Sequence, residues 1–145
     1  MSPLETFVSK NLRWFSGRGH ETTETISKAE LQLGVNFPSE LKWILCEHGY
    51  WHATGISSLE ETIADTLSAR EHLDMPSKFI VLYNHQDGGG IIMDTEDSNT
   101  IYNIEWISFP HAIESAIVCS SYLEYVTEVL ADAEDIIDPE DVDCA

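Results

Sequence analysis

Residues 79–94, FIVLYNHQDGGGIIMD, decide the fold. The run at residues 79–83 is apolar and rich in β-branched and aromatic side chains, which is typical of a buried strand. Asp87 and three glycines follow it, and this combination is a strong turn signal. Residues 91–93 are apolar again. The stretch therefore predicts two strands joined as a β-hairpin.

Strand and turn signals continue on the C-terminal side. Residues 94–99 are polar and predict a second turn, while residues 100–106 alternate well enough for a third strand. Ser121 and Glu124 then have the spacing of a helix capping box, and an apolar helical stripe follows them. From residue 132 the chain carries seven acids in fourteen residues, which predicts a solvated or frayed tail.

Helical patterns precede the hairpin. Apolar residues recur at helical spacing over residues 3–15 and again over residues 60–73. Helices followed by a strand meander and a last helix predict an α+β domain. The sheet is expected to be antiparallel or mixed, with helices covering one face.

Two further helices are predicted between these segments. Ser27 and Glu30 have capping-box spacing, so a helix is expected to start at Ser27 and to end at Gly34. Pro38 suits the first turn of the next helix, and Gly49 supplies its stop.

The charge of the chain is strongly uneven. Residues 1–78 hold seven Lys or Arg and eleven carboxylates, whereas the rest of the chain holds fifteen carboxylates and no Lys or Arg; the net charge is −19. Such a surface repels nucleic acid and anionic lipid, because both are bound through cations that neutralise phosphate. It attracts basic proteins and speeds their encounter. The expected partner is therefore a basic protein, with no nucleic acid and no membrane.

Composition also indicates the cellular compartment of the protein. No apolar run approaches the ~18–20 residues that a membrane span needs, and the N-terminus lacks an apolar signal core. The three cysteines, Cys46, Cys119 and Cys144, are odd in number and show no paired spacing, which fits a reducing compartment. A cytoplasmic protein is expected.

The order of these motifs resembles the SUKH superfamily, which includes the fungal Smi/Knr cell-wall regulators and many bacterial immunity proteins. The matching segments are Leu33-Gly34, Phe37-Pro38, His48-Gly49, residues 79–82, the glycine turn at 88–90, Ile92-Met93-Asp94-Thr95, Ile101-Tyr102 and the late helix that starts at Tyr122. The resemblance covers roughly residues 25–131. It implies one SUKH-like domain at residues 1–131, followed by an acidic tail at residues 132–145.

The resemblance implies a binding protein and no enzyme or cofactor. Its bacterial members are similar to cytoplasmic antidotes that bind and neutralise polymorphic or contact-delivered toxins, frequently nucleases. The alternative is a regulatory protein-binding scaffold of the Smi/Knr type. Charge leads to a compatible expectation, because a nuclease is typically basic around its active site.

Two groups of residues could in principle carry other chemistry. Cys46, His48 and His52 could ligate zinc, but packing and helix capping explain them better. Cys119 with His111 could form a nucleophile and base, but nothing around them indicates an oxyanion site. No metal site and no catalytic residue are therefore predicted.

The polar run after the hairpin is less easily dismissed. Its side chains fall at positions 1, 3, 5, 7 and 12 of a calcium-loop template: Asp94, Glu96, Ser98, Thr100 and Glu105. Position 6 is Asn99 where the template has glycine, and the flanks predict strands. A β-turn is favoured, and calcium stays an open alternative.

The expected partner-binding residues are carboxylates and aromatics. Acidic side chains on the turns and strands would pair with Lys and Arg of the partner, and aromatics would anchor the contact. For the two tryptophans, a core position is an equal alternative. The predicted set is Trp51, Glu60, Glu61, Asp94, Glu96, Asp97, Glu105 and Trp106.

Overall fold

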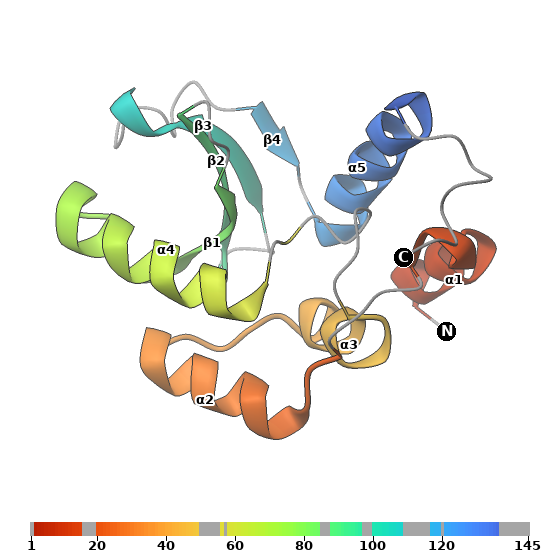
Figure 1. The fold of residues 1–145 in the computed structure, drawn as a ribbon, viewed down its shortest axis with the longest axis horizontal. Helices are drawn as coiled ribbons and strands as arrows, with labels where there is room; N and C mark the ends of the chain where they lie inside the picture. The colour runs from red at the N-terminus through yellow and green to blue at the C-terminus, as the bar shows by residue number, and fades with distance from the viewer. Residues whose placement is uncertain are drawn as a thin grey trace.

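The computed structural model describes residues 2–15, 20–49, 56, 58–84, 88–96, 100–108, 117–119 and 121–136. Their elements are, in chain order, α1 (Pro3–Lys10), η1 (Leu12–Phe15), α2 (Thr23–Leu33), α3 (Ser39–Glu47), α4 (Leu59–Leu73), β1 (Phe79–Asn84), β2 (Gly89–Asp94), β3 (Ile101–Glu105), η3 (Trp106–Ser108), β4 (Ile117–Cys119) and α5 (Tyr122–Ile136). The strands form one layer, with α4 on one side and α5 on the other (Figure 1). The α+β class is confirmed.

The described strands form a single antiparallel sheet in the order β1-β2-β3-β4. The predicted meander is therefore confirmed. Its register fixes two ends. At one end Phe79 pairs with Asp94, and at the other Asn84 pairs with Gly90 and Gly89 pairs with Glu105. We call these the Asp94 end and the Trp106 end, since Trp106 follows Glu105 directly.

Helices cover both faces of the sheet, so the expectation of cover on one face is wrong. Ile80 and Met93 pack on one face in the core that includes α1 and α5, whereas Val81 and Ile92 pack on the other face with Ala69 of α4. The physical reason is the unbroken apolar run in β1. A strand without alternation is apolar on both sides, and each side needs a cover.

Helix α4 is held to the sheet by a buried hydrogen bond. The backbone nitrogen of Val81 donates to the Thr66 hydroxyl at 2.9 Å. The pairing of β1 with β2 is irregular between Val81 and Tyr83, and such a bulge re-aims the side chains that follow it. The helix start is fixed by Ser58, whose hydroxyl accepts from the backbone nitrogen of Glu61 at 3.0 Å.

Helix α2 starts earlier than predicted. Its cap is Thr22, which forms a capping box with Thr25, so Ser27 lies inside the helix. Glu30 does not serve as a capping residue, because its carboxylate accepts from the backbone nitrogen of Phe37 at 2.7 Å. The predicted end is confirmed, since Gly34 adopts the left-handed conformation with φ 67°.

The N-terminal helical segment is two elements instead of one. α1 ends at Lys10 and is capped by Asn11, whose side-chain amide donates to the carbonyl of Phe7 at 2.9 Å, and η1 follows. Of the apolar stripe predicted here, Leu4, Val8 and Phe15 are buried in the core, whereas Leu12 is exposed.

At the other end of the chain, Ser121 caps α5 by accepting from the backbone nitrogen of Glu124 at 3.1 Å. Tyr122 and Val126 are fully buried. The helix runs to Ile136 and so extends beyond residue 132, where the acidic tail was expected to begin. Among the described helices, none has the length and apolar character to cross a membrane.

Candidate partner-binding site

Three carboxylates lie along the N-terminal half of α4. Glu60 and Glu61 lie in its first turn, where negative charge is favoured by the helix dipole, and both are exposed. Asp65 follows one turn later and is half-buried. The opposite side of the helix is buried against the sheet. We call Glu60, Glu61 and Asp65 the acidic α4 edge.

A chain of hydrogen bonds joins this edge to Trp106. The indole Nε1 of Trp106 donates to Asn84 Oδ1 at 2.9 Å, and the Asn84 side chain is also hydrogen-bonded to Asp65. Burial is the main cause that raises the pKa of Asp65, and the charge of Glu61 adds to it, while the hydrogen bond from Asn84 lowers it. The polar chain fixes the orientation of the indole.

Trp106 also packs closely on the backbone of β2. A Cβ atom built at Gly90 would lie 2.3 Å from Cζ2 of Trp106, so only glycine leaves room for the ring. Trp106 is half-buried and packs against the edge of the apolar core between α4 and the sheet. The ring is therefore partly structural, with one side still open to solvent.

Asp94 is not available to a partner, which corrects its place in the predicted set. Its side chain is 1% exposed. One carboxylate oxygen lies 3.1 Å from Lys78 Nζ, and the other accepts from the backbone nitrogen of Glu96 at 2.9 Å. The backbone nitrogen of Asp94 donates to the carbonyl of Thr100 at 2.7 Å. The last of these bonds joins the end of β2 to the residue before β3, while residues 97–99, on which the β-turn and calcium-loop interpretations depend, lie outside the described residues.

The remaining predicted residues are spread over the molecule. Glu96 is exposed beyond the Asp94 end of the sheet, whereas Glu105 is exposed at the Trp106 end. Residues that are close in sequence are thus separated by the length of the strands. Trp51 and Asp97 lie outside the described residues. Of the predicted set, Glu61 and Trp106 are brought together through Asp65 and Asn84, two residues that the sequence reasoning missed.

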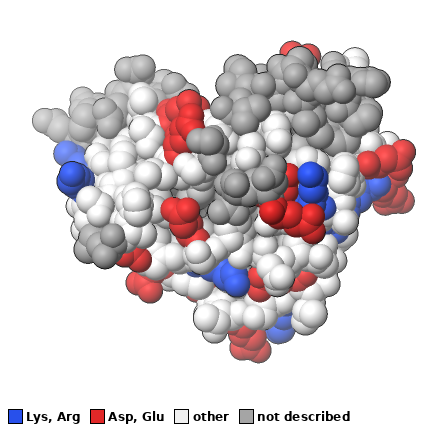
Figure 2. Space-filling model, turned by 180° about the vertical axis from the view of Figure 1, so that it is seen from behind, with Lys and Arg blue, Asp and Glu red and all other residues white. Residues whose placement is uncertain are grey.

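On the one face drawn in Figure 2, the acidic side chains of the described residues do not merge into one continuous patch. On the face seen in Figure 2, Asp and Glu stand in several separate groups, some of them next to Lys or Arg. A local signal for the α4 group was present in the sequence, because Glu61 and Asp65 are spaced as i and i+4 on a predicted helix.

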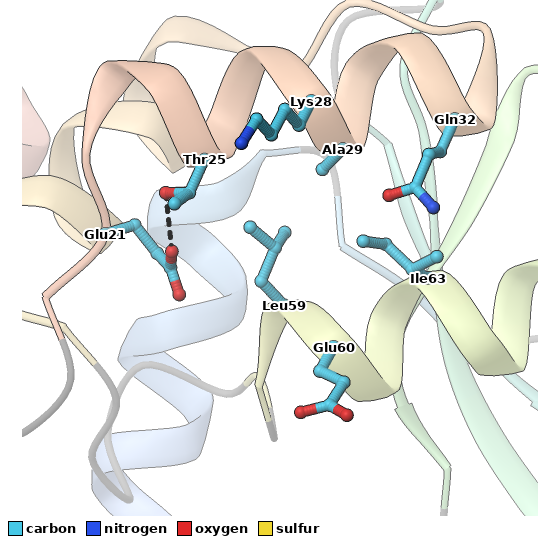
Figure 3. A pocket seen from close by; sticks show the side chains of 8 residues that line it. All are labelled: Glu21, Thr25, Lys28, Ala29, Gln32, Leu59, Glu60 and Ile63. Carbon is cyan, nitrogen blue, oxygen red and sulfur yellow. Dashed lines mark hydrogen bonds between the residues drawn. The ribbon is translucent and has the colours of Figure 1, made fainter.

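A groove lies between α2 and α4 (Figure 3). Its volume is about 360 Å³, and it is open to solvent. Side chains of both helices line it, including Glu60 of the acidic α4 edge: Glu21, Thr25, Lys28, Ala29, Gln32, Leu59, Glu60 and Ile63.

Packing explains the positions of Cys46 and His48 better than zinc binding does. His48 ends α3, and its ring lies edge-on to Phe15 and Trp43, with ring centroids 6.3 and 5.2 Å away. Burial lowers the pKa of His48. The third proposed ligand, His52, lies outside the described residues.

Cys119 lies in a different cluster. Its Sγ donates to Glu128 Oε2 at 3.2 Å, and ligand atoms of Cys119, Glu124 and Glu128 lie within 4.8 Å of one another. Burial, the hydrogen bond to Glu128 and the charges of the two glutamates raise the pKa of the thiol to about 12. The raised pKa keeps Cys119 a thiol that is hydrogen-bonded to Glu128.

The Cys119 thiol should consequently react slowly in the folded protein. Only the thiolate is nucleophilic, and a raised pKa leaves little of it at pH 8. We expect iodoacetamide to label Cys119 at least ~100-fold more slowly in buffer than in urea, as followed by peptide mass spectrometry. Glu128→Gln should speed the labelling, whereas Glu71→Gln on the distant surface of α4 should not. Equal rates in buffer and in urea would contradict this account.

Helices on both faces of an antiparallel meander define one small α+β domain. The chain belongs to the SMI1 / KNR4 family (SUKH-1), whose model matches residues 21–137. The match begins just before α2 and ends just after α5, slightly beyond the residues 25–131 that the motifs indicated. The family is generally one of non-catalytic immunity and scaffold proteins. No curated protein matches the chain at a significant level.

Proposed function

We propose that this chain is a cytoplasmic immunity protein that binds and neutralises a cognate polymorphic or contact-delivered toxin. The observation that carries the proposal is the charge: fifteen carboxylates and no Lys or Arg follow Lys78. Membership of a family that includes immunity proteins supports it. A nuclease is the toxin class that the charge favours, because an enzyme that binds phosphates presents cations around its active site.

The acidic α4 edge and Trp106 supply the proposed contact. Glu60 and Glu61 are exposed and pair with Lys or Arg of the toxin, while the Trp106 ring, which is joined to Asp65 through Asn84, adds apolar contact area. Glu96 and Glu105 are exposed at the two ends of the sheet and steer the encounter from further away. Trp51 and Asp97 remain predictions of the sequence. Asp94 drops out, because it is buried.

The proposal is tested with the toxin domain itself. The gene immediately upstream is expected to encode a large secreted protein with a variable C-terminal domain. Co-expression of that domain with this chain should give a complex that survives purification and a cell that survives the toxin. A chain that binds signalling proteins and leaves such a toxin active would favour the regulatory scaffold of the Smi/Knr type instead.

Association with the toxin domain should depend strongly on salt. Steering between opposite charges is screened as ionic strength rises, so the association rate is expected to fall about tenfold or more between 20 and 500 mM NaCl, measured by stopped flow. The double variant Glu60→Gln/Glu61→Gln should slow association at low salt. Glu71→Gln, exposed near the other end of α4, is the matched control. A rate that does not change with salt would rule out the acidic surface as the binding determinant.

A further inference from the structure

The short helix η3 carries the most exposed large apolar side chain that the structure describes. Ile107, its middle residue, is 93% exposed. The helix follows β3 directly, and Figure 1 shows it in cyan at the outer margin of the fold. A single exposed apolar residue is ordinary on a protein surface and by itself indicates nothing. Ile107 differs from such residues in the rigid support beside it and in the charge around it.

The residue before Ile107 is fixed on several sides. The backbone nitrogen of Trp106 donates to the carbonyl of Gly88 at 3.0 Å, and its indole Nε1 donates to Asn84 Oδ1 at 2.9 Å. The ring also fills the space at Gly90 where any other residue would place its Cβ. Glycine within a strand weakens it, and the indole that Gly90 admits explains its presence in β2. These contacts hold the start of η3 in place before any partner binds.

The charge at the Trp106 end of the sheet is negative. The end of β1, the start of β2, the end of β3 and η3 all follow Lys78, and the chain has no Lys or Arg beyond that residue. Glu105 is exposed and lies two residues before Ile107. Asp65 of α4 is joined to the Trp106 indole through Asn84. An exposed apolar side chain therefore lies on a part of the sheet that carries carboxylates and no cation.

We propose that Ile107 is the apolar anchor of the toxin contact and enters an apolar pocket on the basic partner. Lys or Arg side chains around that pocket pair with Glu105 and with the acidic α4 edge. The buried centre of a protein interface is apolar and its rim is polar, as this arrangement requires. Because Trp106 already holds the turn, the contact costs little conformational entropy. This inference rests on the proposed function, which makes the partner a basic protein.

Charge favours a basic protein over two other occupants, a second copy of the chain and a membrane. Two copies that met at the Trp106 end would bring the same carboxylates together, and like charges placed opposite one another oppose association. An anionic lipid surface is repelled for the same reason, since it is bound through Lys and Arg.

The anchor is tested with the toxin domain expected from the upstream gene and the variant Ile107→Ser. We expect the dissociation constant to rise about ten- to a hundredfold, because a buried isoleucine side chain is lost from the interface. The change should lie in the dissociation rate, measured by stopped flow, while the association rate stays within about twofold. Ile107→Val keeps most of the side chain and should weaken binding only about three- to fivefold.

Leu31→Ser is the matched control. Leu31 is 84% exposed, but it lies on α2, a helix that also carries Lys28. This variant should bind the toxin domain as tightly as the wild-type chain. Neither serine substitution should shift the melting temperature by more than about 3 °C, because both side chains are exposed. A weaker complex of Ile107→Ser is then a property of the contact and not of the fold.

The outcomes separate the anchor from the proposed function. A toxin domain that binds Ile107→Ser as tightly as Leu31→Ser overturns the anchor and leaves the immunity function intact. If the wild-type chain binds no such domain, the proposed function fails and the anchor fails with it. Sedimentation velocity gives the last arm. A wild-type dimer that Ile107→Ser dissociates would make this side chain a contact between copies of the chain and would overturn the anchor.

Discussion

Replacing Gly90 by alanine is expected to lower the free energy of unfolding by about 2–3 kcal/mol, the usual cost of overpacking. The added Cβ would lie 2.3 Å from Cζ2 of Trp106 and 2.6 Å from Cε2. The indole cannot move away freely, because its Nε1 donates to Asn84. Strand β2 cannot yield either, since it pairs with β1 on one side and β3 on the other. Urea denaturation followed by circular dichroism measures the loss.

The same substitution in a Trp106→Leu background provides the control. Without the indole ring, Gly90→Ala should cost less than about 1 kcal/mol, because the atoms that the new methyl group meets are gone. The coupling between the two sites then isolates the contact of Gly90 with the ring. An equal cost in both backgrounds would show that glycine is needed at this position for another reason.

Lys78→Met is expected to destabilise the fold by about 2–3 kcal/mol, more than Asp94→Asn. The Asp94 carboxylate is 1% exposed, whereas the Lys78 side chain is 40% exposed. Removing the lysine leaves a buried carboxylate without that ammonium, and breaking a buried pair in this way is costly. Removing the carboxylate leaves an ammonium that reaches water. Asp94→Asn should therefore cost only about 1 kcal/mol, mainly from a weaker hydrogen bond to Glu96.

Two further variants, measured by urea denaturation, test whether losing Lys78 costs more stability than losing the Asp94 charge. Lys28→Met breaks an ion pair between two exposed side chains and should change stability by less than about 0.5 kcal/mol. The double variant Lys78→Met/Asp94→Asn should recover part of the loss, because no buried charge remains. If Asp94→Asn costs as much as Lys78→Met, burial of the carboxylate is not the source of the effect. Neither substitution should alter the affinity for a partner bound at the acidic α4 edge.

Much of the fold could be predicted from local signals. The hairpin of β1 and β2, the end of α2 at Gly34 and the start of α5 after Ser121 each depend on a few neighbouring residues. The start of α2 could not be predicted in the same way, because two capping signals compete within a few residues. Thr22 prevails, and the carboxylate of Glu30 instead binds the backbone of Phe37, a contact that only the folded chain creates.

The candidate site was harder to predict because its residues come from separate elements. Asp94 and Glu105 are close in sequence, but the antiparallel register sends them to opposite ends of the sheet. Conversely, Asp65, Asn84 and Trp106 lie on three different elements, and only the packing of α4 on the sheet brings them together. Charge patterns in the sequence indicate how acidic a surface is, but the fold decides which carboxylates remain on it.

One side of α4 is buried against the sheet and the other is exposed to solvent, so the two sides tolerate substitution differently. Thr66 and Ala69 hold the helix to the sheet, while Glu60 and Glu61 are exposed to solvent. Substitutions on the outer side leave the fastening intact, so they cost little stability. If α4 binds the toxin as proposed, a lineage that carries this domain can redirect it to a new toxin through single exposed substitutions, while the contact between the helix and the sheet stays unchanged.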